Sequence, residues 1–150
     1  MNSEADQIFE TIPVQALLEK VGEMRKQAYR LVQISATRLP DQLELTYSFD
    51  LDGRLVNFRL HIPDSNLRVP SISSIYWCAF LYENEMHDLF NLVVDGMAVD
   101  FHGTLYKTAV KFPFGSTKAP TAKPGATQTA STPSQPASAP PAPSTTATIR

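Results

Sequence analysis

Residues 71–90 decide how this chain folds, and they read Ser-Ile-Ser-Ser-Ile-Tyr-Trp-Cys-Ala-Phe-Leu-Tyr-Glu-Asn-Glu-Met-His-Asp-Leu-Phe. The segment begins mostly apolar and ends with three acids and a histidine. On a helical wheel its apolar side chains share one broad face, which predicts a helix that covers a sheet. That face is formed by Ile72, Ile75, Tyr76, Ala79, Tyr82, Met86, Leu89 and Phe90.

The same segment also carries apolar side chains on its opposite side. Trp77 and Leu81 project there, in line with Asn84 and Asp88. A helix that is apolar on two sides is expected to be covered on two sides, and a small domain has little left to supply the second cover. We therefore predict that a partner protein contacts Trp77 and Leu81.

Glu83 is the one carboxylate inside the apolar arc of this segment. Acidic side chains are rarely buried unless they are paired, because an unpaired buried charge loses its hydration. We therefore expect an arginine to bind Glu83, with Arg54, Arg59 and Arg68 as the candidates.

The residues before this segment predict one helix and an antiparallel sheet. Residues 12–27 place apolar side chains at helical spacing, whereas residues 29–37, 43–51 and 56–62 are rich in β-formers or alternate apolar and polar side chains. Asp52-Gly53 is typical of a tight hairpin turn between the last two strands. The predicted fold class is α+β, with an antiparallel sheet of three to four strands and helices packed on one face.

The chain after residue 90 predicts an arm and a tail. Short extended pieces are expected at 92–94, 97–101 and 104–112, and residues 95–114 are expected to form a docking arm that leaves the domain. Residues 115–150 hold seven of the 12 prolines and consist largely of Ala, Pro, Ser and Thr. We predict a domain at 1–114 and a disordered tail at 115–150, because such a composition cannot bury enough apolar surface.

Charge and cysteine content limit the possible functions. Residues 1–114 hold all 15 acids but only 10 of the 13 bases, and an acidic body disfavours nucleic acid as a partner. The single cysteine, Cys78, excludes an internal disulfide or a four-thiolate metal site, and its place in an apolar run predicts a buried side chain in a reducing compartment. No Gly-rich phosphate loop is present.

The N-terminus predicts no signal peptide, and the apolar runs predict no membrane-spanning segment. The N-terminus is polar and acidic, unlike a signal peptide. The longest apolar run is 75–82, which is far shorter than the roughly 20 residues of a membrane-spanning helix. We therefore expect a soluble chain.

The acids and the histidine also allow an enzymatic interpretation. Glu83 and His87 are four residues apart, where two ligands of one metal could lie, and Asp88 is adjacent. Di-metal carboxylate sites use Glu-x-x-His on more than one helix, and no second copy exists here. A stand-alone metal-dependent enzyme that uses Glu83, His87 and Asp88 is therefore kept as a secondary alternative.

The string from Val69 to Tyr76, followed by residues 82–90, resembles a family signature. It is similar to the 30 kDa subunit family of respiratory complex I and to its relatives in energy-converting membrane-bound nickel–iron (NiFe) hydrogenases. The family pattern is a Val-Pro-Ser-type turn, an apolar helix and then Glu-Arg-Glu-x-x-Asp-Leu-Phe-Gly-Ile. The matching positions are Pro70, Ser71, Glu83, Glu85, Asp88, Leu89 and Phe90.

The resemblance covers about residues 10–112, and several positions depart from the family pattern. Asn84 replaces the arginine between the glutamates, Asn91 replaces the glycine after Phe90, and Trp77 replaces a proline that often breaks the segment. Basic residues that follow in the respiratory version are Met97 and Phe101 here. The short arm looks more like that of the small family member in Ech-type hydrogenase.

This resemblance implies a non-catalytic structural subunit without a cofactor of its own. It would dock onto the large catalytic subunit and the iron–sulfur subunits, peripherally on the cytoplasmic side of the cell membrane. The NiFe centre and the iron–sulfur clusters would lie in those partners, which reduce protons with electrons from ferredoxin and couple this to ion translocation. The 30 kDa subunit of a quinone-reducing complex I, of the NADH dehydrogenase type, is the alternative.

We expect two surfaces to bind the partner subunits. The first is the Trp77 and Leu81 side of the predicted helix, and the second is the apolar and basic end of the arm. The arm residues expected at the interface are Tyr106, Lys107, Lys111, Phe112 and Phe114.

Overall fold

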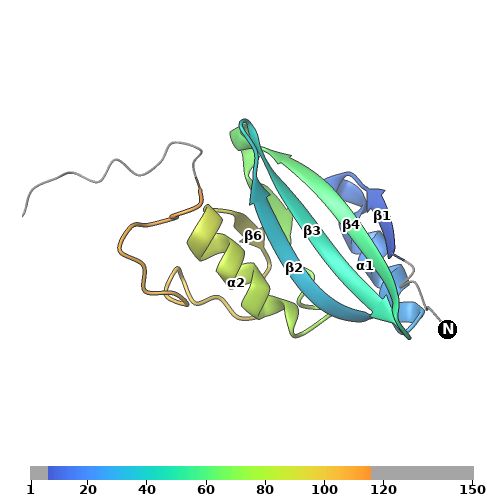
Figure 1. Cartoon of the computed structure of the whole chain (residues 1–150). Helices are drawn as coiled ribbons and strands as arrows, with labels where there is room; N and C mark the ends of the chain where they lie inside the picture. Colours follow the sequence, from blue (N-terminus) through green and yellow to red (C-terminus); the bar gives the residue numbers. More distant parts are fainter. Residues whose placement is uncertain (1–6, 116–150) are drawn as a thin grey trace, which may run out of the picture.

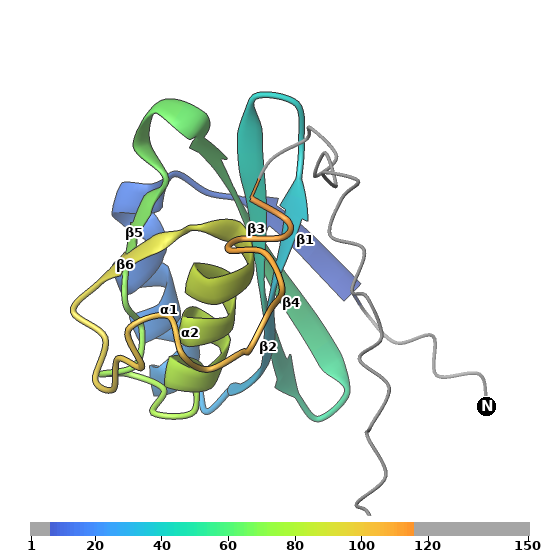
Figure 2. The ribbon, with the colours of Figure 1, turned by 90° about the vertical axis from the view of Figure 1, so that its left-hand side faces the viewer.

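The computed structural model describes residues 7–115, which form a four-stranded sheet with two helices on one face (Figures 1 and 2). The strand order is β1-β4-β3-β2. The strands are β1 Gln7–Thr11, β2 Arg30–Arg38, β3 Gln42–Leu51 and β4 Arg54–Pro63. The helices are α1 Leu17–Lys26 and α2 Ala79–Phe90, with short 3-10 turns η1 Val14–Ala16 and η2 Asp64–Asn66. The predicted α+β class is confirmed.

The centre of the sheet is the predicted hairpin of β3 and β4. Asp52 and Gly53 both have positive φ, 51° and 86°, as a two-residue hairpin turn requires. Alternate side chains of both strands are buried and face the helices, with Tyr47 opposite Phe58 and Phe49 opposite Val56. The helices α1 and α2 pack on this apolar face of the sheet.

The sheet is mixed, whereas a purely antiparallel sheet was predicted. The difference is β1, which was not predicted as a strand. β1 pairs in parallel with β4, from Gln7 opposite Leu55 to Thr11 opposite Arg59. Its side chains are mostly exposed, so it lacks the alternation that reveals a half-buried strand. The helix predicted at 12–27 accordingly begins later, at Leu17, after the short turn η1.

Residues 71–90 are not one helix, since α2 begins only at Ala79. The residues before it form turns that still bury Ile72 and Tyr76, and the Tyr76 hydroxyl donates a 2.7 Å hydrogen bond to the Tyr29 carbonyl. The helix ends at Asn91, whose φ of 62° is left-handed. Apart from glycine, Asn is among the residues that tolerate this conformation best. Asn91 can therefore stand where the family pattern has glycine.

The arm does not leave the domain. After α2, the short strand β6 (Val93–Asp95) pairs in parallel with β5 (Arg68–Pro70), and the chain then returns along α2 (Figures 1 and 2). The Phe114 N–H donates to the Leu89 carbonyl at 2.9 Å, and the Phe114 ring lies 5.6 Å from that of Phe90.

Of the extended pieces predicted after residue 90, only the first corresponds to a strand, β6. Residues 97–101 and 104–112 form turns instead. Within residues 7–115, no helix has the length and apolar character needed to cross a membrane. Almost all of the predicted tail, residues 116–150, lies outside the described residues.

Candidate docking site

Glu83 is a buried residue of α2. Its carboxylate is hydrogen-bonded by the turn before the helix and not by an arginine. Its Oε2 accepts a 2.7 Å hydrogen bond from the Ser71 hydroxyl, and its Oε1 accepts one of 2.7 Å from the Ile72 N–H. The expected arginine pair is wrong: Arg59 lies beside Glu44 and Arg68 binds Asp95. Nearby backbone and hydroxyl donors can stabilise a buried carboxylate without a second charge.

Burial governs the electrostatics of Glu83. It raises the pKa of the carboxyl above its ordinary value, and the hydrogen bonds from Ser71 and Ile72 offset part of that rise. Tyr47 lies in the same core, where burial, and secondarily the charge of Glu83, raises the pKa of its phenol.

The Glu83 carboxylate begins a polar chain that reaches the arm. The hydroxyls of Ser71 and Ser73 lie 2.6 Å apart, and the Ser73 Oγ accepts a 2.9 Å hydrogen bond from the Ala98 N–H. Pro70, just before Ser71, lies opposite Asp95 in the small sheet. The signature residues Pro70, Ser71 and Glu83 therefore help to hold the turn, the helix and the start of the arm together.

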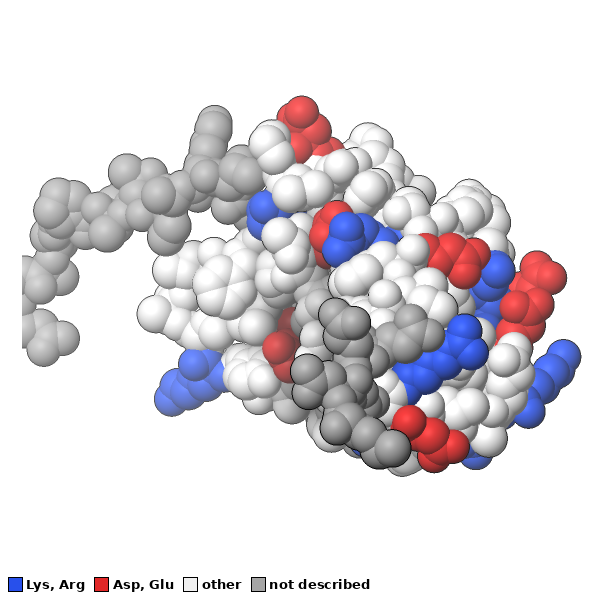
Figure 3. Space-filling view, turned by 45° about the vertical axis from the view of Figure 1, so that its right-hand side comes forward, with Lys and Arg blue, Asp and Glu red and all other residues white. Residues whose placement is uncertain are grey.

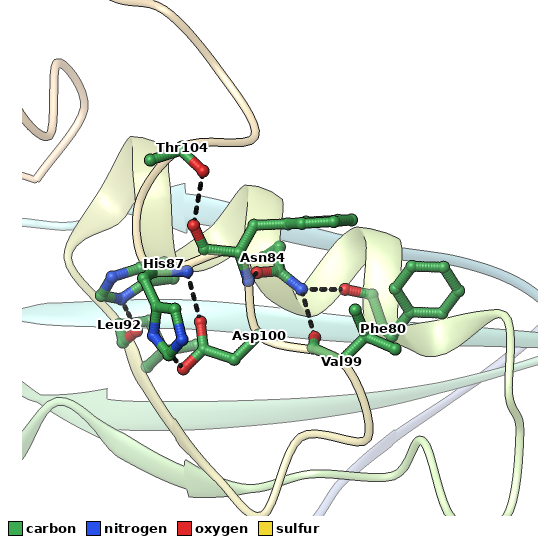
Figure 4. A network of polar contacts seen from close by, with 9 residues as sticks. Phe80, Asn84, His87, Leu92, Val99, Asp100 and Thr104 are labelled. Carbon is green, nitrogen blue, oxygen red and sulfur yellow. Dashed lines mark hydrogen bonds and ion pairs between the residues drawn. The ribbon is translucent and has the colours of Figure 1, made fainter.

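Asn84 was not predicted as a site residue, yet it fixes the arm on α2 (Figure 4). Its side-chain amide donates to the carbonyls of Phe80 (2.7 Å) and Val99 (2.8 Å), and its Oδ1 accepts from the Phe101 N–H (2.8 Å). The arm thus covers the Asn84 and Asp88 side of the helix, where we expected a partner protein. The sequence signal that could have pointed to Asn84 is that it replaces the arginine of the family pattern.

Asp88 and Glu85 bind the next part of the arm. Asp88 Oδ2 accepts a 2.9 Å hydrogen bond from the Tyr106 N–H, and the Tyr106 hydroxyl lies 3.4 Å from Glu85 Oε2. The charge of Glu85 raises the pKa of the Tyr106 phenol. Of the remaining signature residues, Phe90 is buried in the core and Leu89 is packed against it.

Glu83 does not share a site with His87 and Asp88, the other two residues of the metal-enzyme alternative. Glu83 faces Ser71, Asp88 faces Tyr106, and His87 Nδ1 lies 3.1 Å from the Leu92 carbonyl. Within residues 7–115, no group of three or more His, Cys, Asp or Glu is placed to hold a metal ion.

Trp77 and Leu81 are exposed, with 63% and 48% of their surface accessible. Leu81, Leu105 and Tyr106 line a groove of about 400 Å³ between α2 and the arm. Cys78 also lines this groove and is exposed, contrary to our expectation, because it lies in the turn just before α2. We call the set Trp77, Cys78, Leu81, Leu105 and Tyr106 the docking face.

The other predicted interface residues are distributed around the arm. Lys107 and Lys111 are exposed, and the half-buried Phe112 ring lies 6.0 Å from that of His87. Phe114 is exposed but lies elsewhere, in a groove beside β2 with Ile34 and Phe90. The structure therefore does not bring all predicted interface residues onto one surface.

The outer face of the sheet is polar. Glu44 lies there between Arg59 and His61, at 3.4 Å and 3.0 Å. On the face that Figure 3 shows, basic and acidic side chains are interspersed and neither sign forms a large patch. Nucleic-acid binding needs clustered basic side chains, so this face offers no such site.

Comparison with known proteins agrees with this architecture. The model of the family described as "Respiratory-chain NADH dehydrogenase, 30 Kd subunit" matches residues 10–114. The chain therefore belongs to the complex I 30 kDa subunit family, and it is a 30 kDa-like subunit of the kind found in respiratory membrane complexes. No curated protein sequence matches it significantly.

The solved structures that share the fold include the following two. A chain of the membrane-bound sulfane sulfur reductase, an archaeal respiratory membrane complex, is 19% identical with a TM-score of 0.66, covering 76% of this chain and 72% of that one. The trypsin-resistant fragment (1–134) of Nqo5 is 20% identical with a TM-score of 0.54, covering 61% of this chain and 80% of the fragment.

Proposed function

We propose that this chain is a non-catalytic structural subunit of a membrane-bound energy-converting NiFe hydrogenase, and that it docks onto the large catalytic subunit. The observation that carries the proposal is the docking face in a member of the complex I 30 kDa family. Trp77 and Leu81 remain exposed although the arm covers the neighbouring Asn84. Large aromatic and aliphatic side chains grouped on a surface are typical of protein interfaces.

The docking partners would supply the redox chemistry. In this proposal the NiFe centre and the iron–sulfur clusters belong to neighbouring subunits, and this chain holds no cofactor. Electrons from ferredoxin would reduce protons there, coupled to ion translocation. The chain would lie peripherally on the cytoplasmic side of the membrane and reach it only through the complex.

The 30 kDa subunit of a quinone-reducing complex I is the second candidate. The family description, which names the NADH dehydrogenase, and the likeness to the Nqo5 fragment favour it. The hydrogenase assignment rests instead on the short arm and on Met97 and Phe101, which stand where the respiratory version has basic residues.

Mass spectrometry of the proteins that co-purify with the tagged full-length chain tests both candidates. We expect a large subunit with two Cys-x-x-Cys motifs, which a hydrogenase needs to hold nickel and iron. A large subunit without these motifs would assign the chain to a quinone-reducing complex. Absence of membrane redox subunits would contradict both.

A further inference from the structure

A small cavity of about 130 Å³ lies between α2 and the arm, beside the docking face. It is lined by His87, Asp88, Gly103, Tyr106 and Lys111, among others. Tyr106 also lines the groove of the docking face, so a partner seated on that face would lie next to the cavity.

Asp88 contributes an unsatisfied acceptor to this cavity. The residue is only 6% exposed, and its Oδ2 accepts the Tyr106 N–H. Its Oδ1 is buried and has no hydrogen-bond partner within residues 7–115. A buried carboxylate oxygen without a partner is costly, so a donor group is expected to bind there.

His87 contributes a second acceptor. Its Nδ1 lies 3.1 Å from the Leu92 carbonyl, which can only accept, so Nδ1 carries the hydrogen. In the neutral imidazole, Nε2 is then an acceptor.

The two acceptors converge on one point beside Gly103. A Cβ added to Gly103 would lie 3.7 Å from His87 Nε2 and 3.8 Å from Asp88 Oδ1. Because glycine has no side chain, this point is free, and the φ of +75° favours glycine there. A single donor group near this point could serve both atoms after a small adjustment.

Two acceptors, one of them charged, match a cationic group with several N–H donors. A guanidinium presents five such donors in a plane and binds carboxylates strongly. A metal ion would need more ligands, and no suitable group of three was found within residues 7–115. We propose that this cavity binds the guanidinium of an arginine side chain inserted by the subunit that covers the docking face, an inference that rests on the proposed function.

A second source of cationic donors is the chain itself. Lys111 lines the cavity and is exposed, so its ammonium group could reach the same acceptors. The experiment must therefore distinguish an arriving guanidinium from this ammonium group.

The test is a titration of the full-length chain with methylguanidinium chloride at constant ionic strength, followed by NMR at His87 Nε2 and the Gly103 and Tyr106 amides. Tetramethylammonium, a cation without N–H donors, is the matched probe. Asp88→Asn keeps an oxygen for the Tyr106 N–H but removes the charge. Asp52→Asn makes the same change at an exposed turn far from the cavity.

We expect saturable shifts with methylguanidinium in the wild type and in Asp52→Asn, and at least about tenfold weaker binding in Asp88→Asn. Equal shifts with tetramethylammonium, no saturable shift, or unchanged affinity in Asp88→Asn would overturn the proposal. Binding that appears only in Lys111→Met would overturn it in favour of the chain's own ammonium. No partner is needed, so this result is independent of co-purification.

Discussion

The Ser71 hydroxyl donates a 2.7 Å hydrogen bond to Glu83 Oε2 across 12 residues of sequence. The second oxygen of the same carboxylate accepts the Ile72 N–H. Both oxygens of one carboxylate therefore accept hydrogen bonds from the turn that precedes α2. This is why a carboxylate can occupy the apolar arc of the helix.

Glu83→Ala is expected to destabilise the domain. The substitution leaves the buried Ile72 N–H and Ser71 hydroxyl without their acceptor, which costs about 2–4 kcal/mol in free energy of unfolding. Glu85→Ala is the matched control, because Glu85 is half-buried and lies 3.4 Å from the Tyr106 hydroxyl, at the edge of hydrogen-bond distance. Chemical denaturation measures both, and equal effects would show that the Glu83 contacts contribute little.

The stability of the domain should also depend on pH through Glu83. Its folded pKa is raised above the ordinary value, so the native state binds more protons than the unfolded chain between the two values. Glu83 therefore makes its full contribution to the free energy of unfolding at pH values below its pKa in the unfolded chain. This contribution is lost as the pH rises through its pKa in the folded state.

Glu83→Gln removes this titration while it keeps an oxygen for the Ile72 N–H. The stability of the Glu83→Gln variant relative to wild type should therefore increase as the pH rises above the ordinary pKa of a glutamate, from about pH 4 upward. Urea denaturation over this range measures the difference. A difference that stays constant with pH would contradict the raised pKa.

Asn84→Ala should release the arm from α2. The amide of Phe101 loses its acceptor, and the carbonyls of Phe80 and Val99 lose their donor. We expect hydrogen exchange of the Phe101 amide to accelerate about five- to thirteenfold, since a net hydrogen bond of about 1–1.5 kcal/mol is lost there. Asn66→Ala, an exposed site, should leave this exchange unchanged. Unaltered Phe101 exchange in Asn84→Ala would contradict the role of Asn84.

Leu81→Asp should weaken assembly without unfolding the chain. Leu81 is exposed on the docking face, so a charge costs little in the free chain but would be buried at an interface. Leu18→Asp is a matched control on α1, where Leu18 has 43% of its surface exposed. We expect at least about tenfold less co-purified large subunit for Leu81→Asp than for Leu18→Asp, with similar melting temperatures. Equal recovery would place the interface elsewhere.

The candidate site was only partly predictable from sequence. The exposure of Leu81 followed from its place opposite the apolar arc of the helix, which is a property of the local pattern, whereas Trp77 is exposed in the turn before α2. The burial of Asn84 did not, because its partners Val99 and Phe101 lie 15 and 17 residues away. The predicted burial of Cys78 failed for a local reason, since the helix begins one residue later.

The sequence by itself determined the hairpin of β3 and β4, the apolar faces that meet in the core, and the family. These features depend on side-chain alternation, on the Asp52-Gly53 turn and on a contiguous motif, and all of these are short-range. Only the tertiary structure decided that β1 pairs with β4, that Glu83 binds a turn, and that the arm returns over Asn84 and Asp88. Each of these depends on hydrogen bonds between segments distant in sequence, and the competition among possible partners is settled only when the chain packs.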